Sequence, residues 1–267
     1  MSQSIIVKPG EKVKLKDFDP NYSEGYKDKK SAEKEMKKIR KQMIQLQSLL
    51  YAESKHALLI ILQALDTGGK DGTIRHVMAG VDPQGCDVKS FKVPTPEESA
   101  HDFLWRAHKV TPCKGKIMIF NRSYYEDILV VRVHNLVPKE VWKKRYEQIN
   151  NFETFLTENN TVVMKFYLHI SKDEQKKRLE KRLTDPSKLW KFSEGDLKER
   201  KFWDDYMDAY EDALTKCNTE DAPWYIVPSN KKWYRNLMIG QAIVDKLKSL
   251  DMKYPEPQGS FDKIVID

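Results

Sequence analysis

Short apolar runs alternate with longer segments of helical periodicity along most of the chain. Continuous apolar stretches, typical of strands buried on both faces of a parallel sheet, lie at residues 57–62, 88–93, 116–120, 161–170 and 224–227. Apolar residues three and four apart predict amphipathic helices at residues 31–54, 71–78, 95–111, 138–155, 171–185, 196–216 and 233–250. Strands that alternate with helices in this way favour an α/β fold, with a parallel sheet flanked by helices.

Two of the predicted helices have clear start signals. Thr95, Pro96 and Glu98 occupy the positions of an N-cap, a first-turn proline and a capping-box partner. Ser171 and Glu174 have the spacing of a second capping box. Both signals support the predicted helix boundaries.

The chain shows no internal repeat and no linker that divides it. Residues 1–30 are polar, with scattered Lys and Asp, and indicate an N-terminal arm. Residues 31–250 are predicted to form one domain, which includes a helical lid at about residues 172–200. Residues 251–267 are predicted to be a C-terminal tail.

Composition points to a polyanionic partner. Of 267 residues, 33% are charged, and the formal net charge is +7. Such an excess of cations suggests nucleic acid, an anionic membrane surface or a phosphate-rich small molecule. The N-terminus lacks the apolar core of a signal peptide and no apolar run is long enough to span a bilayer, so we expect a cytoplasmic protein. Cys86, Cys113 and Cys217 form no C-x-x-C pair, and we expect reduced thiols.

A strand, a glycine loop and a helix follow one another at residues 57–78, and this order predicts an anion site. Gly68 and Gly69 allow backbone N–H groups to turn toward one point, the helix start adds further unpaired N–H groups, and Lys70 can extend its ammonium there. Only the Gly-Lys pair matches the usual phosphate-loop pattern, whose first Gly and final Ser/Thr are replaced by Ala and Asp. An ordinary turn between strand and helix is the alternative.

Acidic residues near this loop suggest a metal ion. Asp66 lies inside the loop, where it would repel phosphate unless a divalent metal lay between them. Arg122 follows the strand at residues 116–120, where ligands bind in open α/β sheets, and can clamp phosphate with two hydrogen bonds. Glu126 and Asp127 are either metal ligands or solvated turn carboxylates.

The helix predicted at residues 171–185 is strongly basic. Its cations Lys177, Arg178, Lys181 and Arg182 form one broad side. A Lys-rich helix is usually just a solvated face. A surplus of cations facing a phosphate site, however, is what a lid over a polyanion requires, and we favour the lid.

Four segments, LQALDTGGKDGTIR, IFNRSYYEDILVVRV, HISKDEQKKRLEKRLTDPSKLWKFSEGDL and APWYIVPSNKKWYRN, strongly resemble the family-2 polyphosphate kinases and follow in the same order. The similarity extends over residues 51–250, most of the chain. The resemblance implies a P-loop kinase fold related to thymidylate kinase. It also implies transfer of the terminal phosphoryl group of inorganic polyphosphate to a nucleotide with Mg²⁺, or with Mn²⁺ as an alternative ion.

The residues and the resemblance together define a candidate site. We expect Asp66, Lys70, Arg122 and Asp127 at the catalytic centre. The candidates for phosphate and nucleotide binding are Thr67, Gly68, Gly69, Asp71, Gly72, Thr73 and Asn121. The candidates for polyphosphate binding in the lid are Arg178, Lys181, Arg182, Lys188, Lys191 and Asp196.

One position departs from the family pattern. Many members carry Asp at the position of Asn121, where it would bind metal. Asn followed by Tyr-Glu-Asp resembles the subgroup described as class III, which accepts nucleoside mono- and diphosphates. The departure makes Asp127 a candidate metal ligand beside Asp66.

Other functions remain open on the sequence alone. They are an ATP-dependent nucleoside monophosphate kinase, a P-loop protein that uses hydrolysis for motion, and a basic nucleic-acid-binding module in which Trp190 and Phe192 stack on bases. The last leaves Asp66 unexplained. We expect inorganic polyphosphate and nucleotides (AMP, ADP, ATP and, as further candidates, guanine nucleotides) as partners, without nucleic acid or membrane. We also expect a homo-oligomer, dimer or tetramer, with the helix at residues 31–54 as one candidate interface.

Overall fold

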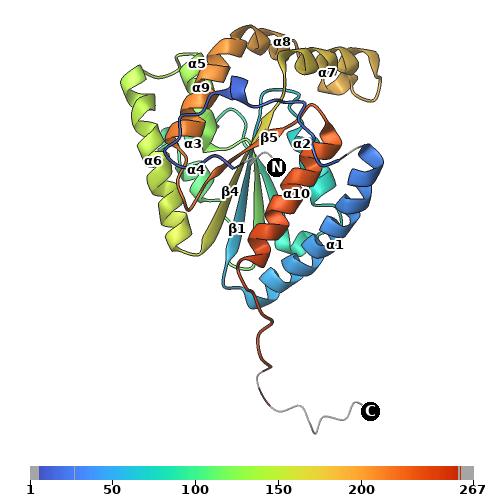
Figure 1. Cartoon of the computed structure of the whole chain (residues 1–267). Coiled ribbons are helices and arrows are strands. Elements are labelled where there is room, and N and C mark those ends of the chain that lie inside the picture. Colours follow the sequence, from blue (N-terminus) through green and yellow to red (C-terminus); the bar gives the residue numbers. More distant parts are fainter. Residues whose placement is uncertain (1–5, 27, 258, 260–267) are drawn as a thin grey trace.

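The computed structural model describes residues 6–26, 28–257 and 259, and its frame is a five-stranded parallel sheet (Figure 1). The strand order is β2-β3-β1-β4-β5, and every pairing is parallel. The bounds are β1 (Ala57–Gln63), β2 (Cys86–Ser90), β3 (Ile117–Asn121), β4 (Thr161–His169) and β5 (Trp224–Pro228). All residues of the central strand β1 are buried, as its continuous apolar run predicts.

Helices cover both faces of the sheet. The longer ones are α1 (Lys29–Glu53), α2 (Lys70–Val77), α6 (Lys139–Glu158), α7 (Lys172–Thr184), α9 (Trp203–Lys216) and α10 (Lys232–Lys248). The shorter ones are α3 (Pro96–Ala100), α4 (Trp105–His108), α5 (Val130–Val133) and α8 (Glu194–Glu199). Single 3₁₀ turns are η1 (Leu15–Asp17), η2 (Pro83–Gly85), η3 (Tyr124–Asp127), η4 (Leu189–Lys191) and η5 (Arg200–Phe202). Within the described ranges, none of the helices has the length and apolar character needed to cross a membrane.

The core lies in two layers, one on each face of the sheet. Alternate residues of β1 point to opposite faces, so Leu59 and Ile61 join the cluster formed with α6 and α9, whereas Leu58 and Ile60 join the cluster formed with α1 and α10. Gly240 of α10 allows the close approach of α1, because a Cβ atom there would lie 2.9 Å from Cγ2 of Ile39. The apolar face of α1 is therefore used inside the domain.

The N-terminal segment is more tightly attached than its polar composition predicts. Val7, Val13 and Leu15 are buried in the core cluster that contains α9. Ile6 forms an antiparallel bridge with Tyr225, so this segment runs along the outer side of β5 (Figure 1). The few apolar residues of this stretch, rather than its average polarity, decide its position.

Three predicted helical details differ from the structure. The helix predicted at residues 95–111 is split into α3 and α4, because the Asp102 carboxylate accepts hydrogen bonds from the N–H groups of Leu104 and Trp105 and starts a new turn. Ser171 caps α7, but the Glu174 carboxylate contacts Arg178 at 2.7 Å instead of completing a capping box. The helix predicted at residues 196–216 is divided into α8, η5 and α9.

Candidate active site

The loop between β1 and α2 has a backbone shape that requires glycine. Gly69 has φ +106°, and a Cβ atom there would lie 1.9 Å from Nη1 of Arg235. At Gly68 a Cβ atom would lie 2.5 Å from Cβ of Ala64. Thr67 also has a positive φ, of 61°. The two glycines thus let the loop turn sharply over α10 and lead into the first turn of α2, as predicted for an anion site.

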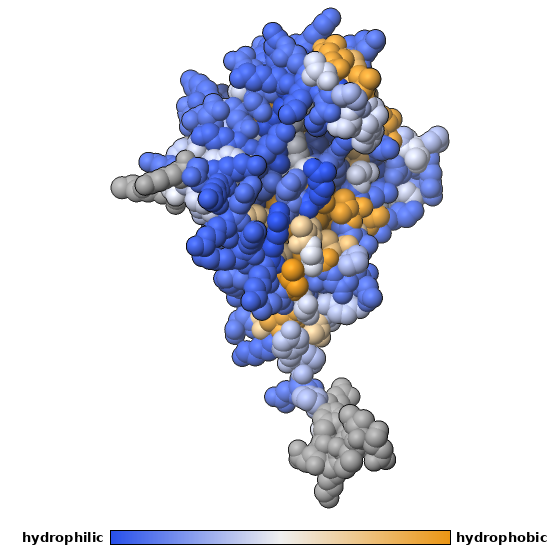
Figure 2. Space-filling model, turned by 90° about the vertical axis from the view of Figure 1, so that its right-hand side faces the viewer, coloured by the Kyte–Doolittle hydropathy of each residue, from blue (hydrophilic) through white to orange (hydrophobic). Residues whose placement is uncertain are grey.

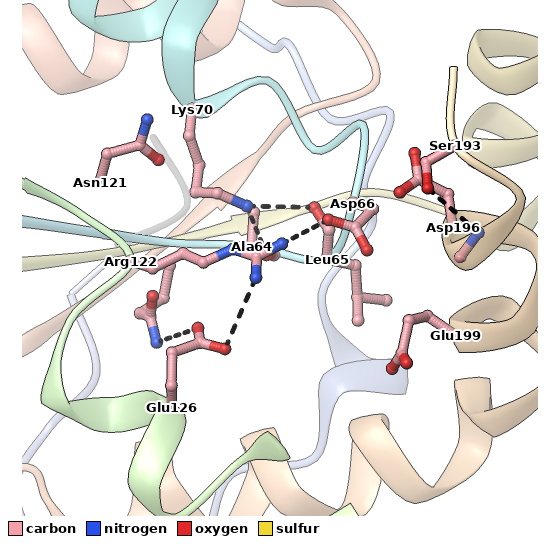
Figure 3. Close-up of polar contacts among 12 residues, drawn as sticks. Ala64, Leu65, Asp66, Lys70, Asn121, Arg122, Glu126, Ser193, Asp196 and Glu199 are labelled. Carbon is pink, nitrogen blue, oxygen red and sulfur yellow. Dashed lines mark hydrogen bonds and ion pairs between the residues drawn. The ribbon is translucent and has the colours of Figure 1, made fainter. Parts of the chain in front are cut away.

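Lys70 extends from the first turn of α2 back under this loop. Its Nζ donates to the carbonyl of Ala64 at 2.8 Å and to that of Leu65 at 3.4 Å (Figure 3). Burial, together with the positive charge of Arg122, lowers the pKa of Lys70 to about 8. The ammonium is therefore held in place before any phosphate binds. Its positive charge is poorly compensated by neighbouring groups.

Arg122 lies between two carboxylates at the carboxyl end of β3. Its Nη2 is 2.6 Å from Oδ1 of Asp66, and its Nη1 is 4.0 Å from Oε2 of Glu126 (Figure 3). Arg122 has φ +60°, which turns the chain from β3 into η3. Burial lowers the pKa of Arg122, but the charges of Glu126 and Asp66 outweigh this effect and the net shift is upward. The pair Asp66–Arg122 joins the first and second predicted motifs in one centre.

Asp127 does not join this centre. Its Oδ1 is 3.2 Å from Nη1 of Arg145 and its Oδ2 is 3.6 Å from Nη2 of Arg106, and it is absent from the cleft lining that the structure describes. Burial raises the pKa of Asp127, and the two arginines oppose that shift. Successive residues of a 3₁₀ turn point about 120° apart, so Glu126 faces Arg122 while Asp127 faces away. The structure thus separates Asp127 from Asp66, contrary to the expectation that both hold one metal.

Arg178 of the basic helix is tied to the loop. Its guanidinium donates to the carbonyls of Thr67, Gly68, Ser229 and Asn230 at distances from 2.5 to 3.1 Å. These four bonds join α7 to the glycine loop and to the end of β5. Arg178 lies at the base of the cleft, as expected for a site residue, but its donors are directed at protein carbonyls.

The outer part of the predicted lid is held by ion pairs. Arg182 contacts Asp196 at 2.5 Å and the carbonyl of Lys191, which joins α7 to α8. Lys191 also reaches Asp71 at 3.1 Å, and Lys188 pairs with Asp185. Burial and the charge of Asp66 raise the pKa of Asp196. Of these contacts, the pair Lys191–Asp71 joins the lid to the first turn of α2.

One cleft of about 1290 Å³ lies between the loop and the lid. Thirteen of the predicted site residues line it: Asp66, Thr67, Gly69, Lys70, Asp71, Gly72, Asn121, Arg122, Arg178, Lys181, Arg182, Lys188 and Lys191. Gly68, Thr73, Asp127 and Asp196 are outside the lining. Asn121 donates from Nδ2 to Asp71 at 2.9 Å. The buried Oγ1 of Thr67 has no partner in the described part of the chain, as expected where a ligand would bind.

Seven cations among the described residues that line the cleft were missing from the predicted set: Lys29, Lys37, Arg40, Arg75, Lys92, Lys232 and Arg235. Arg235 of α10 donates to the carbonyl of Gly68 at 3.3 Å, and burial beside Arg178 lowers its pKa to about 9. Arg75 of α2 also lines the cleft. Arg235 belongs to the segment APWYIVPSNKKWYRN, which carries part of the family resemblance. The motif thus pointed to this segment but did not indicate which of its residues faces the cleft.

The acidic residues of the centre suit a magnesium ion that also binds substrate phosphates and water. They suit less well a metal whose ligands all come from the protein. No group of three or more His, Cys, Asp or Glu residues within residues 6–26, 28–257 and 259 is arranged to hold a metal. Asp66 lines the cleft, with its side chain 22% exposed, and Glu126 lies on the other side of Arg122. Mg²⁺ commonly binds one or two carboxylates together with substrate phosphates and water. Asp66 meets this requirement.

Comparisons with known proteins agree with this geometry. Residues 26–255 match the model of the family described as Polyphosphate kinase 2 (PPK2). The AMP/ADP-polyphosphate phosphotransferase of Meiothermus ruber is 51% identical over 98% of both chains. The ADP-polyphosphate phosphotransferase of Rhodopseudomonas palustris is 47% identical over 96% of this chain and 92% of that protein.

A solved structure also has the same fold. The crystal structure of Polyphosphate Kinase 2 from Arthrobacter aurescens TC1 superposes with a TM-score of 0.92, at 45% identity, and covers 96% of this chain and 92% of that chain. The family model spans the glycine loop, the Arg122 turn and the lid. The chain belongs to the polyphosphate kinase 2 family.

Proposed function

We propose that this protein is a kinase that transfers the terminal phosphoryl group of inorganic polyphosphate to AMP, ADP or both. The observation that carries the proposal is the cleft in which Lys70, Arg122 and the lid cations converge on the glycine loop. A linear polymer of phosphates needs many cations in a row, whereas a single nucleotide needs few. The relatives named for AMP/ADP and ADP phosphotransfer support the same reaction.

Phosphoryl transfer depends on alignment and charge neutralisation more than on covalent chemistry. The acceptor is a nucleotide phosphate oxygen that is already anionic at neutral pH, so no strong general base is required. Lys70 and Arg122 then brace the transferring group as its negative charge shifts. The salt bridge between Arg122 and Asp66 keeps the guanidinium oriented toward the cleft.

We assign the Mg²⁺ site to Asp66. Glu126, which contacts the other side of Arg122 but is outside the cleft lining, is the neighbouring carboxylate in place of Asp127. Mn²⁺ is the alternative ion. When bound, the metal would neutralise phosphate oxygens and remove the repulsion between them and Asp66. Asp66 lies in the glycine loop itself, and its position beside Arg122 supports this role.

The lid cations would hold the phosphates that follow the terminal one. Lys181, Arg182, Lys188 and Lys191 line the outer cleft, and Asp196 orients Arg182. Asn121 bonds Asp71 at the rim, and the class III resemblance at this position motivates the use of both nucleoside mono- and diphosphates. We further propose a homo-oligomeric protein of the cytoplasm.

Donor substitution tests the proposed reaction. Incubation with polyphosphate and Mg²⁺, first with AMP and then with ADP, is expected to yield ADP and ATP when the nucleotides are resolved by chromatography. Replacing polyphosphate by ATP, with AMP as acceptor, is expected to give little turnover. Efficient transfer from ATP alone would instead indicate an ATP-dependent nucleoside monophosphate kinase. The matched control is Lys70→Ala, in which turnover should fall by orders of magnitude while the circular dichroism spectrum is unchanged.

A further inference from the structure

The carboxylates that line the cleft are already paired with cations. Among the described residues of the lining there are three such contacts: Glu33 with Lys29 at 3.3 Å, Asp66 with Arg122 at 2.6 Å and Asp71 with Lys191 at 3.1 Å. Arg182 and Lys188 of the lid contact Asp196 and Asp185, which lie outside the lining. The other cations of the cleft therefore have no carboxylate of the lining left to neutralise them.

Four cations gather where α7, α10 and the glycine loop meet, and we call them the α7–α10 cluster: Arg178, Lys181, Lys232 and Arg235. The guanidinium groups of Arg178 and Arg235 donate to the same acceptor, the carbonyl of Gly68, at 3.1 and 3.3 Å. Within the described part of the chain, Glu174, which contacts Arg178 at 2.7 Å, is the one carboxylate paired with any member of the cluster. Four positive charges thus share one negative charge.

Arg235 is the member of the cluster that burial affects most. It is only 2% exposed, and none of the described carboxylates contacts it. Its hydrogen bonds to Asn236 and Gly68 use three of the five N–H groups of a guanidinium. Burial and the charge of Arg178 lower its pKa to about 9. A buried cation without a counterion is unfavourable, so this position suits a residue that receives an anion.

Lys232 extends the cluster at the start of α10. It precedes Arg235 by three residues and therefore lies on the same side of the helix. Burial and the charges of Arg178 and Arg235 lower its pKa. Among the described residues, the ammonium groups of Lys232 and Lys181 have no hydrogen bond or ion pair. The first turn of α10 has no side-chain cap, so its N–H groups add partial positive charge.

The cluster adjoins the place where the terminal phosphoryl group would bind. The glycine loop lies between the two, since Lys70 follows the loop and a Cβ atom at Gly69 would lie 1.9 Å from Nη1 of Arg235. Both sets of cations line one cleft. Figure 2 views the side that carries α1, whose residues also line the cleft, and hydrophilic residues predominate there. Consecutive phosphates of one chain can therefore contact Lys70 and the cluster at the same time.

We propose that the α7–α10 cluster is a second phosphate site, which binds the phosphates next to the terminal one in the donor chain. The inference rests on the proposed polyphosphate kinase function. It directs the donor across the glycine loop toward α10 before the chain reaches the outer lid. Lys232 and Arg235 are then substrate-binding residues, and Gly69 is required because a side chain there would occupy the place of Arg235.

Calorimetric titration with tripolyphosphate tests the site directly, without a nucleotide. Lys232→Met and Arg235→Met should each raise the Kd about tenfold, which corresponds to about 1.4 kcal/mol. Long polyphosphate should show the same factor, because the second and third phosphates are present in both donors. Lys248→Met is the matched control, since it removes the same charge at the opposite end of α10, outside the cleft lining, and should bind as wild type.

The Tm of the free protein separates lost binding from lost folding. Each variant of the cluster removes one of several crowded positive charges, so Tm without ligand should stay the same or rise. If Arg235→Met does not fold, Lys232→Met still decides, because Lys232 is exposed at the start of its helix.

The possible outcomes distinguish this inference from the proposed function. An unchanged Kd for tripolyphosphate in Lys232→Met would overturn the second phosphate site, while transfer from polyphosphate to AMP by the wild type would leave the proposed function intact. A raised half-saturation concentration for AMP, with an unchanged Kd for tripolyphosphate, would assign the cluster to nucleotide phosphates instead. A wild-type protein that neither binds tripolyphosphate nor transfers phosphate to AMP would overturn both.

Discussion

Lys70 and Arg122 place two positive charges next to each other inside the domain, and Asp66 and Glu126 hold Arg122 in that position. Within the described part of the chain, the ammonium of Lys70 donates hydrogen bonds to two backbone carbonyls and to no carboxylate. An incoming phosphate would supply the missing negative charge. The centre is thus arranged for an anion before the anion arrives.

The lowered pKa of Lys70 predicts a pH dependence. Because the free protein has a Lys70 pKa of about 8, the charged form is lost as pH rises through that value, and kcat/KM for polyphosphate should fall about tenfold per pH unit above it. The pH profile of Lys70→Arg should lack this descending limb, since Arg stays protonated. A wild-type profile that is flat from pH 7 to pH 9.5 would contradict the prediction.

Substitution of Asp66 is predicted to affect magnesium dependence, whereas substitution of Asp127 is predicted to affect stability. Asp66→Asn should raise the Mg²⁺ concentration needed for half-maximal activity by about tenfold or more. The reason is that Glu126 and the substrate phosphates cannot fully replace the Asp66 carboxylate as a metal ligand. Asp127→Asn should instead leave Arg106 and Arg145 poorly compensated and lower the free energy of unfolding by about 2 kcal/mol. Magnesium titrations and urea denaturation of both variants check this; a larger magnesium effect in Asp127→Asn would return Asp127 to the metal site.

At the scale of elements, η3 connects the core to the catalytic centre. Tyr124 and Tyr125, just after Arg122, both donate to Oε1 of Glu153 at 2.8 Å. Lys165 of β4 contacts Oε2 of the same carboxylate at 2.6 Å, and both charged side chains are fully buried. The turn that carries Arg122 is thereby anchored to α6 and β4.

Removing one partner of the buried ion pair between Glu153 and Lys165 should destabilise the protein. Glu153→Leu is expected to lower the free energy of unfolding by about 3–5 kcal/mol, because Lys165 is left charged in the core. Adding Lys165→Met should recover part of that loss, which urea denaturation of the single and double variants would reveal as a coupling energy. Purely additive losses would show that the two side chains do not act as a pair.

The lid, which includes α7 and the segment after it, contains two kinds of cation. Arg178 is bound to four carbonyls and holds the glycine loop, whereas Lys188 and Lys191, beyond the helix, face the cleft with side chains 41% and 36% exposed. Arg178 therefore stabilises the loop, whereas Lys188 and Lys191 would have to exchange Asp185 and Asp71 for the phosphates of a substrate.

Chain-length dependence tests the lid. The double variant Lys188→Ala, Lys191→Ala should raise the half-saturation concentration for long polyphosphate about tenfold, which corresponds to about 1.4 kcal/mol, and that for triphosphate much less. Lys176→Ala is the matched control, since Lys176 lies on the solvent side of α7 with its side chain 66% exposed. An equal effect on long and short donors would argue against lid binding of the chain.

At the scale of the whole molecule, a net charge of +7 combines with a cationic cleft. If about four lid cations each displace a counterion, the logarithm of the half-saturation constant for polyphosphate should rise with the logarithm of salt concentration with a slope of about 3. Initial rates at several KCl concentrations measure this slope. The corresponding slope for AMP should be smaller, and a polyphosphate constant insensitive to salt would contradict electrostatic binding.

Much of the fold was predictable because burial leaves a local pattern in the sequence. The apolar run of β1, the α1 stripe and the glycine loop before Lys70 were all predicted in place, and the parallel sheet flanked by helices was confirmed. The family was also identified correctly from its motifs. The split at Asp102 and the burial of Val7 and Leu15 were not predicted, because each depends on contacts that appear only after folding.

The sequence alone determined which chemical groups the proposed phosphate site contains: a glycine loop, Lys70, Arg122, Asp66 and a basic helix, since residue type and short spacing are local properties. Only the tertiary structure decided how those groups are used. It turned Glu126 toward Arg122 and Asp127 toward Arg145, bound Arg178 to carbonyls, and brought Arg235 beneath the loop. The direction of a side chain depends on the geometry of its turn and on partners distant in sequence, and neither is encoded in local spacing.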